Sequence, residues 1–207
     1  MARDLQSIVK RSRREGYALH PKAHKALVKR PGPPGQAAAE GGRRRPKASQ
    51  YSVQLREKQK VKRLYGLLER QFAKMMNEAS RTKGQSGITL LQFLERRLDN
   101  VIYRSGFALS RRAARQLVTH GHFMLNGRRI DIPSIRVVVG DVIELREHGK
   151  STEYFKQIDV TSPAPAAIPA WLKADRKKFQ VKVTGLPTRD DAEPDINEQL
   201  IVEYYSR

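Results

Sequence analysis

The apolar positions in the middle third of this chain recur with a helical period. A helix beginning at Ser49 or Ser52, either of which can cap it, is expected to reach Tyr65, where Gly66 stops it. A second helix is indicated by apolar residues at steps of three and four, which we interpret as core: Leu68, Phe72, Met75, Met76 and Ala79.

A third helix is expected to begin at Thr89, which can form a capping box with Gln92, and to end at Gly106. Its period predicts one buried face, made of Leu91, Leu94, Leu98, Val101 and Ile102.

Residues 1–48 lack such a period. Prolines and glycines between Pro31 and Gly42 interrupt every apolar repeat, and residues 43–47 form a basic block without an apolar face. We expect an irregular basic arm that is poorly ordered alone and can fold on its partner. A tail without function is the alternative.

After residue 110 the pattern changes to short alternating runs. Ser110 can cap a short helix, and Asn126-Gly127 predicts a type I′ hairpin turn between strands at 123–125 and 128–132. Further strands are expected at 137–139, 142–146 and 178–183, and the C-terminal LIVEYYSR run is strongly β-prone.

The charge of the chain indicates its partner. There are 41 Lys and Arg against 21 Asp and Glu, a net charge of +20. Such an excess of positive charge favours a polyanion as the binding partner. Nucleic acid is expected, and an anionic membrane surface is the alternative. No apolar run approaches the roughly 20 residues of a spanning helix, and the N-terminus has no apolar signal core, so an intracellular protein is expected.

The positive charge is uneven along the chain. Met1–Tyr65 holds 18 basic and 4 acidic residues, whereas the last twenty residues hold 2 basic and 6 acidic ones. We therefore expect the N-terminal third to face RNA and the acidic C-terminal region to face protein. The alternative is that these acids pair with the chain's own Lys and Arg.

Arginines gather around the short helix and the hairpin. Arg111, Arg112 and Arg115 lie within about one helical turn and are expected on its exposed side. A guanidinium matches phosphate oxygens and stacks on bases, so we expect this module to bind RNA. The residues expected to contact RNA are Arg11, Arg13, Arg14, Arg43, Arg44, Arg45, Lys47, Arg56, Lys58, Lys60, Lys62, Arg63, Arg70, Ser110, Arg111, Arg112, Arg115, Gln116, His120, Asn126, Arg128 and Arg129.

Enzymatic and metal chemistry find little support. His20 and His24 stand four residues apart without carboxylate neighbours, and His120 and His122 flank a glycine that can end a helix. The chain has no cysteine, which excludes disulfides and thiolate metal sites. We expect no metal, no cofactor and no catalytic residue.

One motif suggests a rival function. Arg97-Leu98-Asp99 resembles the catalytic Arg-Leu-Asp of pseudouridine synthases, but the Thr-Ser-Gly-Leu that follows in those enzymes is replaced by NVIYRSGF. We expect Asp99 to lie on the exposed side of the third helix or to bond nearby arginines. An RNA-modifying enzyme and a free RNA-binding stress factor remain the alternatives.

Several motifs carry a family resemblance. Residues 96–146 resemble the small S-four RNA-binding domain, which ribosomal proteins share with several RNA enzymes. The motifs LREKQK from Leu55, ERQF from Glu69, RLDNV from Arg97 and the closing NEQLIVEYYSR resemble the bacterial ribosomal small-subunit protein S-four family. The resemblance runs in order from about Arg13 to the last residue.

The resemblance implies a structural ribosomal protein. Such a protein would bind 16S-type small-subunit RNA directly, nucleate assembly of the subunit body and contribute to translational accuracy. It implies a monomer within a cytoplasmic or organellar ribosome, in direct contact with protein S-five. It also implies a fidelity network with S-twelve and a place near incoming messenger RNA. The residues expected at the protein interface are Glu198, Glu203, Tyr204 and Tyr205.

The resemblance also implies the domain organisation. We expect an α+β fold in which the S-four module, residues 96–159, is inserted into a mainly helical body. That body would comprise residues 49–95 and 160–207 and include a C-terminal strand, with residues 1–48 as the arm. Some family members carry four N-terminal cysteines that bind zinc, and this chain lacks them.

Overall fold

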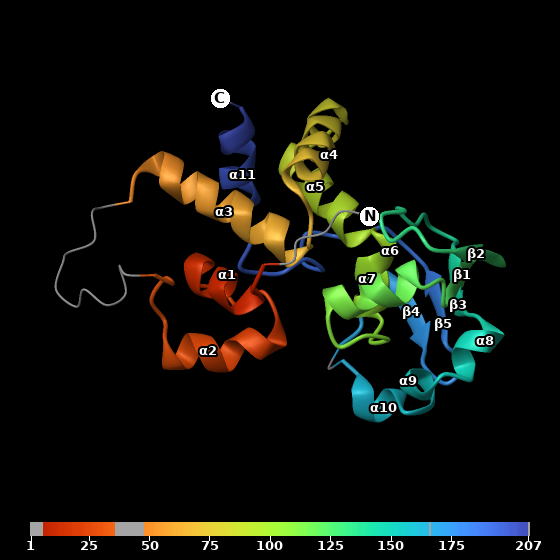
Figure 1. Ribbon diagram of the computed structural model, residues 1–207. Helices are drawn as coiled ribbons and strands as arrows, with labels where there is room; N and C mark the ends of the chain where they lie inside the picture. The colour runs from red at the N-terminus through yellow and green to blue at the C-terminus, as the bar shows by residue number, and fades with distance from the viewer. Residues whose placement is uncertain (1–5, 36–47, 166, 207) are drawn as a thin grey trace. The chain divides into compact units, whose positions relative to one another are not determined.

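The computed structural model describes residues 6–35, 48–165 and 167–206. The chain divides into two compact units (Figure 1). We call Met1–Gly87 with Asp195–Arg207 the helical unit, and Ile88–Pro194 the mixed unit. The expected RNA contacts Arg43, Arg44, Arg45 and Lys47 lie outside the described residues, as does the segment 37–42.

The helical unit contains two long amphipathic helices. Its elements are α1 (Ile8–Glu15), the 3₁₀ turn η1 (Pro21–Ala23), α2 (His24–Lys29), α3 (Gln50–Leu64), α4 (Glu69–Arg81) and α11 (Glu198–Tyr205). Ser49 caps α3 by accepting a hydrogen bond from the Ser52 amide at 3.3 Å, and Gly66 adopts φ +68° beyond its end. The expected limits of this helix are therefore confirmed.

The expectation of an irregular segment is wrong for residues 8–29. Buried Ser12 in α1 accepts a hydrogen bond from the Leu19 amide at 3.3 Å. The Arg13 guanidinium donates to the carbonyls of Arg30 at 3.1 Å and Gly32 at 3.0 Å. These contacts help to hold helices of only eight and six residues, because tertiary packing supplies most of the stability of a short helix.

The chain terminus is also helical, where the sequence favoured a strand. Asn197 caps α11 by accepting a hydrogen bond from the Leu200 amide at 3.4 Å, and Ile201 is fully buried. Figure 1 shows α11 beside α3, with which it makes its main contacts. Burial against a helix has overridden the β-propensity of this run.

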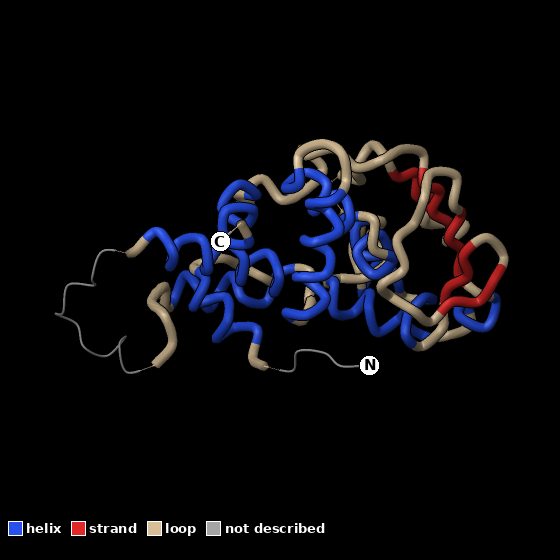
Figure 2. Tube along the Cα trace, turned by 90° about the horizontal axis from the view of Figure 1, so that it is seen from above, coloured by secondary structure: helices blue, strands red, loops and turns tan. Residues whose placement is uncertain are grey.

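The mixed unit packs helices against one antiparallel sheet, which confirms the α+β class. The sheet has the order β2-β1-β3-β5-β4, and Figure 2 shows its strands in red. The strands are β1 (Phe123–Leu125), β2 (Arg128–Ile130), β3 (Val142–Leu145), β4 (Leu172–Asp175) and β5 (Gln180–Val183). The helices are α5 (Ser86–Glu95), which begins at the unit boundary, α6 (Leu98–Arg104), α7 (Arg111–Thr119), α8 (Glu147–Lys150), α9 (Glu153–Lys156) and α10 (Ile158–Thr161).

Strands β4 and β5 join this sheet through β3. Residues 172–183 were expected in the helical body, but they belong to the mixed unit. The core of this unit is mainly aliphatic and contains a group of aromatic rings. Phe155 meets Phe123 edge-on at 6.0 Å and Phe179 at 5.9 Å between ring centroids. The buried Trp171 belongs to the same core.

The expected third helix is two helices. Arg97 is extended, with φ −65° and ψ 136°, and forms an isolated antiparallel bridge with Arg136. The Leu98 amide donates to the carbonyl of Ile135 at 2.8 Å, and the Val137 amide donates to the carbonyl of Arg96 at 2.9 Å. Residues 135–137 therefore pair with this break, and the strand expected at 137–139 does not form. The first helix starts at Ser86, so Thr89 is not its cap.

Candidate nucleic-acid interface

The α7 helix presents one polar face to solvent. The Ser110 hydroxyl accepts a hydrogen bond from the Ala113 amide at 3.2 Å, which confirms Ser110 as the N-cap. Ala114 and Val118 are fully buried and fix the orientation of the helix. Arg112, Gln116 and His120 lie exposed on its other side. Arg111 and Arg115 do not lie there: only 13% and 15% of their side chains are exposed.

Arg115 belongs to a buried ion cluster around Asp99. The Arg97 guanidinium donates two hydrogen bonds to this carboxylate, from Nε to Oδ1 at 3.1 Å and from Nη2 to Oδ2 at 2.7 Å. Arg115 Nη1 donates to the same Oδ2 at 3.0 Å. Of the two expectations for Asp99, bonding to arginines is therefore confirmed and an exposed position is wrong.

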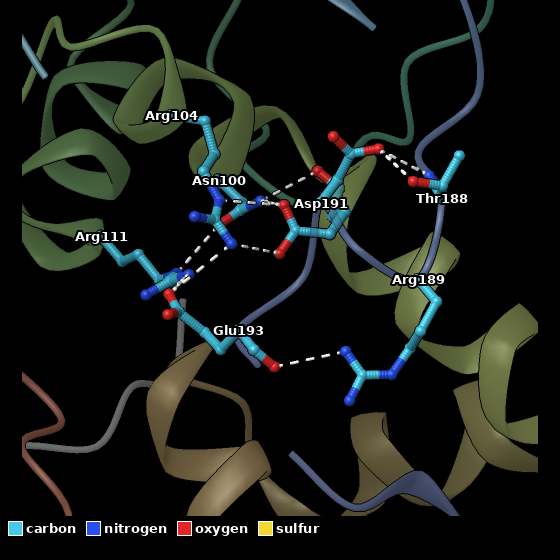
Figure 3. Close-up of polar contacts among 8 residues, drawn as sticks. Asn100, Arg104, Arg111, Thr188, Arg189, Asp191 and Glu193 are labelled. Carbon is cyan, nitrogen blue, oxygen red and sulfur yellow. Dashed lines mark hydrogen bonds and ion pairs between the residues drawn. The ribbon is translucent and has the colours of Figure 1, made fainter. Parts of the chain in front are cut away.

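Arg111 is held by a second cluster, drawn in Figure 3. Its Nη2 donates to Glu193 Oε1 at 3.0 Å, and its Nε donates to Asn100 Oδ1 at 2.8 Å. Arg104 approaches the same Glu193 oxygen at 3.6 Å while forming two hydrogen bonds to Glu95. Burial acts to raise the pKa of Glu193, but Arg111 and Arg104 outweigh it and hold that pKa below its usual value. The acid thus pairs with cations of its own chain.

The hairpin forms as the sequence predicted. Asn126 and Gly127 adopt φ +49° and +77°, as a type I′ turn requires. The Asn126 side chain ties the turn to the start of β3, because it accepts from the Val142 amide and donates to Asp141, both at 2.8 Å. Arg128 and Arg129 beyond the turn are exposed.

Cationic side chains converge around Gly121, which adopts φ +70° just after α7. This φ angle favours glycine, and the Arg129 guanidinium lies close by: a Cβ here would lie 2.9 Å from Arg129 Nε. Arg146 Nη1 donates to the Gly121 carbonyl at 3.2 Å, and the His120 and His122 ring centroids lie 6.0 Å apart. We call these residues, together with His148, the Gly121 cluster.

The groups whose charge bears on His122 are all basic. Burial lowers the pKa of His122, and His120, His148 and Arg146 lower it further. Glu147, the acid nearest to them in sequence, pairs with Lys150 at 2.5 Å. Among the described residues, no group of three or more His, Asp or Glu side chains is placed to hold a metal ion. The sequence did not single out Arg146 and His148, because it is the β1–β3 pairing that brings the end of β3 to the end of α7. His122 adjoins Gly121 in sequence, but its neighbours beyond His120 were not evident from the sequence.

The basic residues of α3 are engaged within the helical unit. Arg56 and Arg63 both pair with Glu15, whose side chain is fully buried. Lys60 pairs with Glu57 at 2.9 Å and also donates to the Asp195 carbonyl at 2.6 Å. These expected RNA contacts therefore stabilise the fold.

Glu69 joins α3 to the C-terminal helix. Lys58 and Lys62 pair with its two carboxylate oxygens at 2.6 and 2.7 Å, and the Tyr205 hydroxyl donates to it at 3.0 Å. Burial acts to raise the pKa of Glu69, but these three hydrogen bonds lower it to about 2. Tyr205, raised in pKa by burial and by Glu69, stays neutral.

The residues expected at the protein interface are half-buried within the helical unit. Glu203 accepts a hydrogen bond from the side-chain Nε2 of Gln54 at 2.8 Å, and Lys58 Nζ lies 4.4 Å from the centre of the Tyr204 ring. The Glu198 side chain packs against Gly87, where an added Cβ would lie 2.8 Å from Glu198 Cγ. These contacts favour the alternative in which the C-terminal acids serve the chain's own fold.

Of the remaining expected contacts, Arg14 and Arg70 are exposed. Arg13 is occupied with the 30–33 loop, and Arg11 is half-buried. None of the helices in the described part of the chain is long and apolar enough to cross a membrane.

Comparison with known proteins accounts for the whole chain. Residues 3–95 match the family model of the ribosomal protein S4/S9 N-terminal domain, and residues 96–143 match the S4 domain. The small ribosomal subunit protein uS4 of Herpetosiphon aurantiacus is 50% identical over 213 residues, covering 100% of both chains. The chain belongs to the uS4 family. The uS4 proteins of Chloroflexus aurantiacus and Clostridioides difficile are 50% and 48% identical, again over 100% of both chains.

Membership in the uS4 family decides between the functions left open by the sequence. The chain is a structural constituent of the small ribosomal subunit with an RNA-binding S4 domain, in a non-enzymatic family. The relatives are bacterial proteins, in agreement with the expected place in a cytoplasmic ribosome. In this non-enzymatic family, the bonds of Asp99 to Arg97 and Arg115 give it a structural role.

Proposed function

We propose that this uS4 protein binds small-subunit ribosomal RNA directly through the outer face of its mixed unit. The Gly121 cluster is the observation that carries the proposal. It gathers the guanidinium groups of Arg129 and Arg146 at Gly121, beside three histidines. The lowered pKa of His122 keeps that ring neutral near pH 7, so it can take part in hydrogen bonds, while the positive charge of the two arginines favours an anion there.

The RNA phosphate backbone supplies that anion. Arg129 and Arg146 offer forked donors to phosphate oxygens, and the exposed Arg112 and Gln116 extend the same polar face along α7. Arg128 extends it along the hairpin. Arg111 and Arg115 support this face without forming part of it. Their ion pairs fix the position of α7 and leave little of either side chain exposed.

Binding of the full chain to a small-subunit ribosomal RNA fragment tests this surface. The double substitution Arg128→Ala and Arg129→Ala removes two exposed guanidinium groups beyond the turn. We expect weaker binding, and a plot of log affinity against log salt that is shallower by about two.

A matched control removes the same charge elsewhere on the same unit. Lys177 and Lys178 are exposed between β4 and β5, and β4 is the strand at the opposite edge of the sheet from β2. Substituting both with alanine should leave the affinity near wild type. Equal losses in the two variants would mean that net charge alone drives binding, and would overturn the assignment.

The family supports further proposals about the ribosome. We propose that this RNA binding nucleates assembly of the subunit body, and that the C-terminal helix contacts protein S-five and contributes to decoding accuracy. We also propose that the protein lies near incoming messenger RNA and acts in one fidelity network with S-twelve. Each of the side chains Glu198, Glu203, Tyr204 and Tyr205 keeps part of its surface exposed on α11, which leaves room for a partner.

Glu203→Gln tests the protein-facing role. Glutamine retains an oxygen that can accept the Gln54 hydrogen bond, so the helix packing is preserved while the charge is lost. Reconstituted subunits should show altered decoding accuracy with unchanged affinity for naked ribosomal RNA. Unaltered accuracy in a variant that assembles normally would assign Glu203 to the fold alone.

A further inference from the structure

The α4 helix has one face fixed by burial. Phe72 and Ala79 are fully buried, and Met75 and Met76 are 8% and 1% exposed. These residues recur at steps of three and four, so they anchor a single stripe of the helix in the core of its unit. The opposite face is therefore held in one orientation towards solvent.

That outer face carries a row of polar side chains, which we call the α4 stripe: Arg70, Lys74, Asn77 and Arg81. All four are exposed. At a rise of 1.5 Å per residue, the row extends for about 16 Å along the helix axis. A nucleic-acid duplex carries one phosphate per roughly 1.7 Å of its axis, so a row of this length can face several phosphates.

The cations of the α4 stripe differ from those of α3. Arg56 and Lys58 on α3 have carboxylate partners at 3.3 and 2.6 Å. Within the described ranges, Arg70, Lys74 and Arg81 have no ion pair with an acid of this chain. Intrachain acids thus pair with the cations of α3, and leave those of the α4 stripe available to an outside anion.

The surface along the α4 stripe is hollowed. A depression of about 690 Å³ is lined by Arg70, Ala73, Lys74, Asn77, Glu78, Arg81 and Thr82. The small Ala73 leaves space between the longer basic side chains. Three cations face a single carboxylate in this lining, so the depression is net positive.

We infer that the α4 stripe binds the phosphate backbone of ribosomal RNA, as a contact additional to the Gly121 cluster. This inference rests on the proposed function, in which the chain binds ribosomal RNA directly. The arginines and Lys74 contact phosphate oxygens, and Asn77 between them can hydrogen-bond to the ribose 2′-hydroxyl. The helical unit then contributes its own RNA-binding surface through α4.

The test replaces Arg70, Lys74 and Arg81 together with alanine in the full chain. Alanine favours the helix and the three positions are exposed, so circular dichroism should show an unchanged fold. Binding to small-subunit ribosomal RNA should weaken at least about tenfold, and the plot of log affinity against log salt should become shallower by about three. Glutamine at the same positions gives a second variant that retains longer side chains.

The matched control removes three charges from another exposed part of the same unit, through alanine at Lys22, Lys25 and Lys29. It should bind RNA much more tightly than the stripe variant. An equal loss in both variants, or wild-type affinity and salt dependence in the stripe variant, would overturn the inference.

Backbone footprinting separates this inference from the proposed function. The stripe variant should lose protection of RNA nucleotides that the variant at Arg128 and Arg129 still protects. If the wild-type chain protects no ribosomal RNA, the proposed function itself fails. If the wild-type chain binds and the stripe variant gives the same footprint, only the inference about α4 fails.

Discussion

The buried ion cluster around Asp99 offers a direct measure of what holds the mixed unit together. Replacing Asp99 with asparagine keeps the shape of the side chain but removes the negative charge shared by Arg97 and Arg115. The side chain of Arg97 is only 4% exposed and that of Asp99 only 6%. The substitution therefore leaves a guanidinium in the protein interior without its counter-charge.

Breaking a buried pair by removing one partner costs about 3–5 kcal/mol, because the remaining charge stays desolvated. With a urea dependence of roughly 2 kcal/mol per molar, typical of a small domain, the unfolding midpoint should fall by about 1.5–2.5 M. Arg115→Ala should cost less, since it leaves both hydrogen bonds between Arg97 and Asp99 in place.

Tryptophan fluorescence reports this unfolding selectively. Trp171 is the only tryptophan in the chain and is 4% exposed in the core of the mixed unit. Asp159→Asn is the matched control, because that carboxylate pairs with Arg176 at 3.2 Å while its side chain is 90% exposed. A surface pair of this kind contributes little, so the midpoint should barely move. A loss below about 1 kcal/mol in Asp99→Asn would refute the reasoning, since it would mean that Arg97 does not depend on its carboxylate.

Three further predictions concern the acid stability, the backbone and the RNA affinity. Because its partners lower the pKa of Glu69 to about 2, from an ordinary 4.5, the ionised form stabilises the helical unit above pH 4.5. The stability difference between wild type and Glu69→Gln, followed by circular dichroism, should vanish as the pH falls from about 4.5 to 2; a constant difference would contradict the shift. Gly106→Ala should destabilise the mixed unit by roughly 1–3 kcal/mol in urea unfolding, because Gly106 adopts φ +78° and an added Cβ would collide with Pro165. An unchanged free energy of unfolding would contradict this steric argument. If about 6–10 phosphates are contacted, affinity for ribosomal RNA in filter binding should fall roughly 10³–10⁵-fold between 50 and 200 mM salt, and a flat response would remove the electrostatic argument.

The sequence by itself determined the elements whose causes are local. The Asn126-Gly127 turn requires two positive φ angles, and Ser49 and Ser110 cap the helices that follow them, so each could be placed from a few neighbouring residues. The period of Phe72, Met76 and Ala79 likewise fixed which face of α4 is buried. The net charge of +20 and the order of the motifs along the chain pointed to RNA and to the ribosomal family.

The tertiary structure alone decided which charges face outward. Arg111 and Arg112 are neighbours of the same type, yet Glu193, distant in sequence, holds the first while the second lies exposed. The basic run of α3 likewise meets Glu15 and Glu69, which are acids of other helices. Burial against α3 makes the β-prone C-terminus a helix. Ion pairing and burial depend on which residues the fold brings within a few ångströms, and local composition does not contain that information.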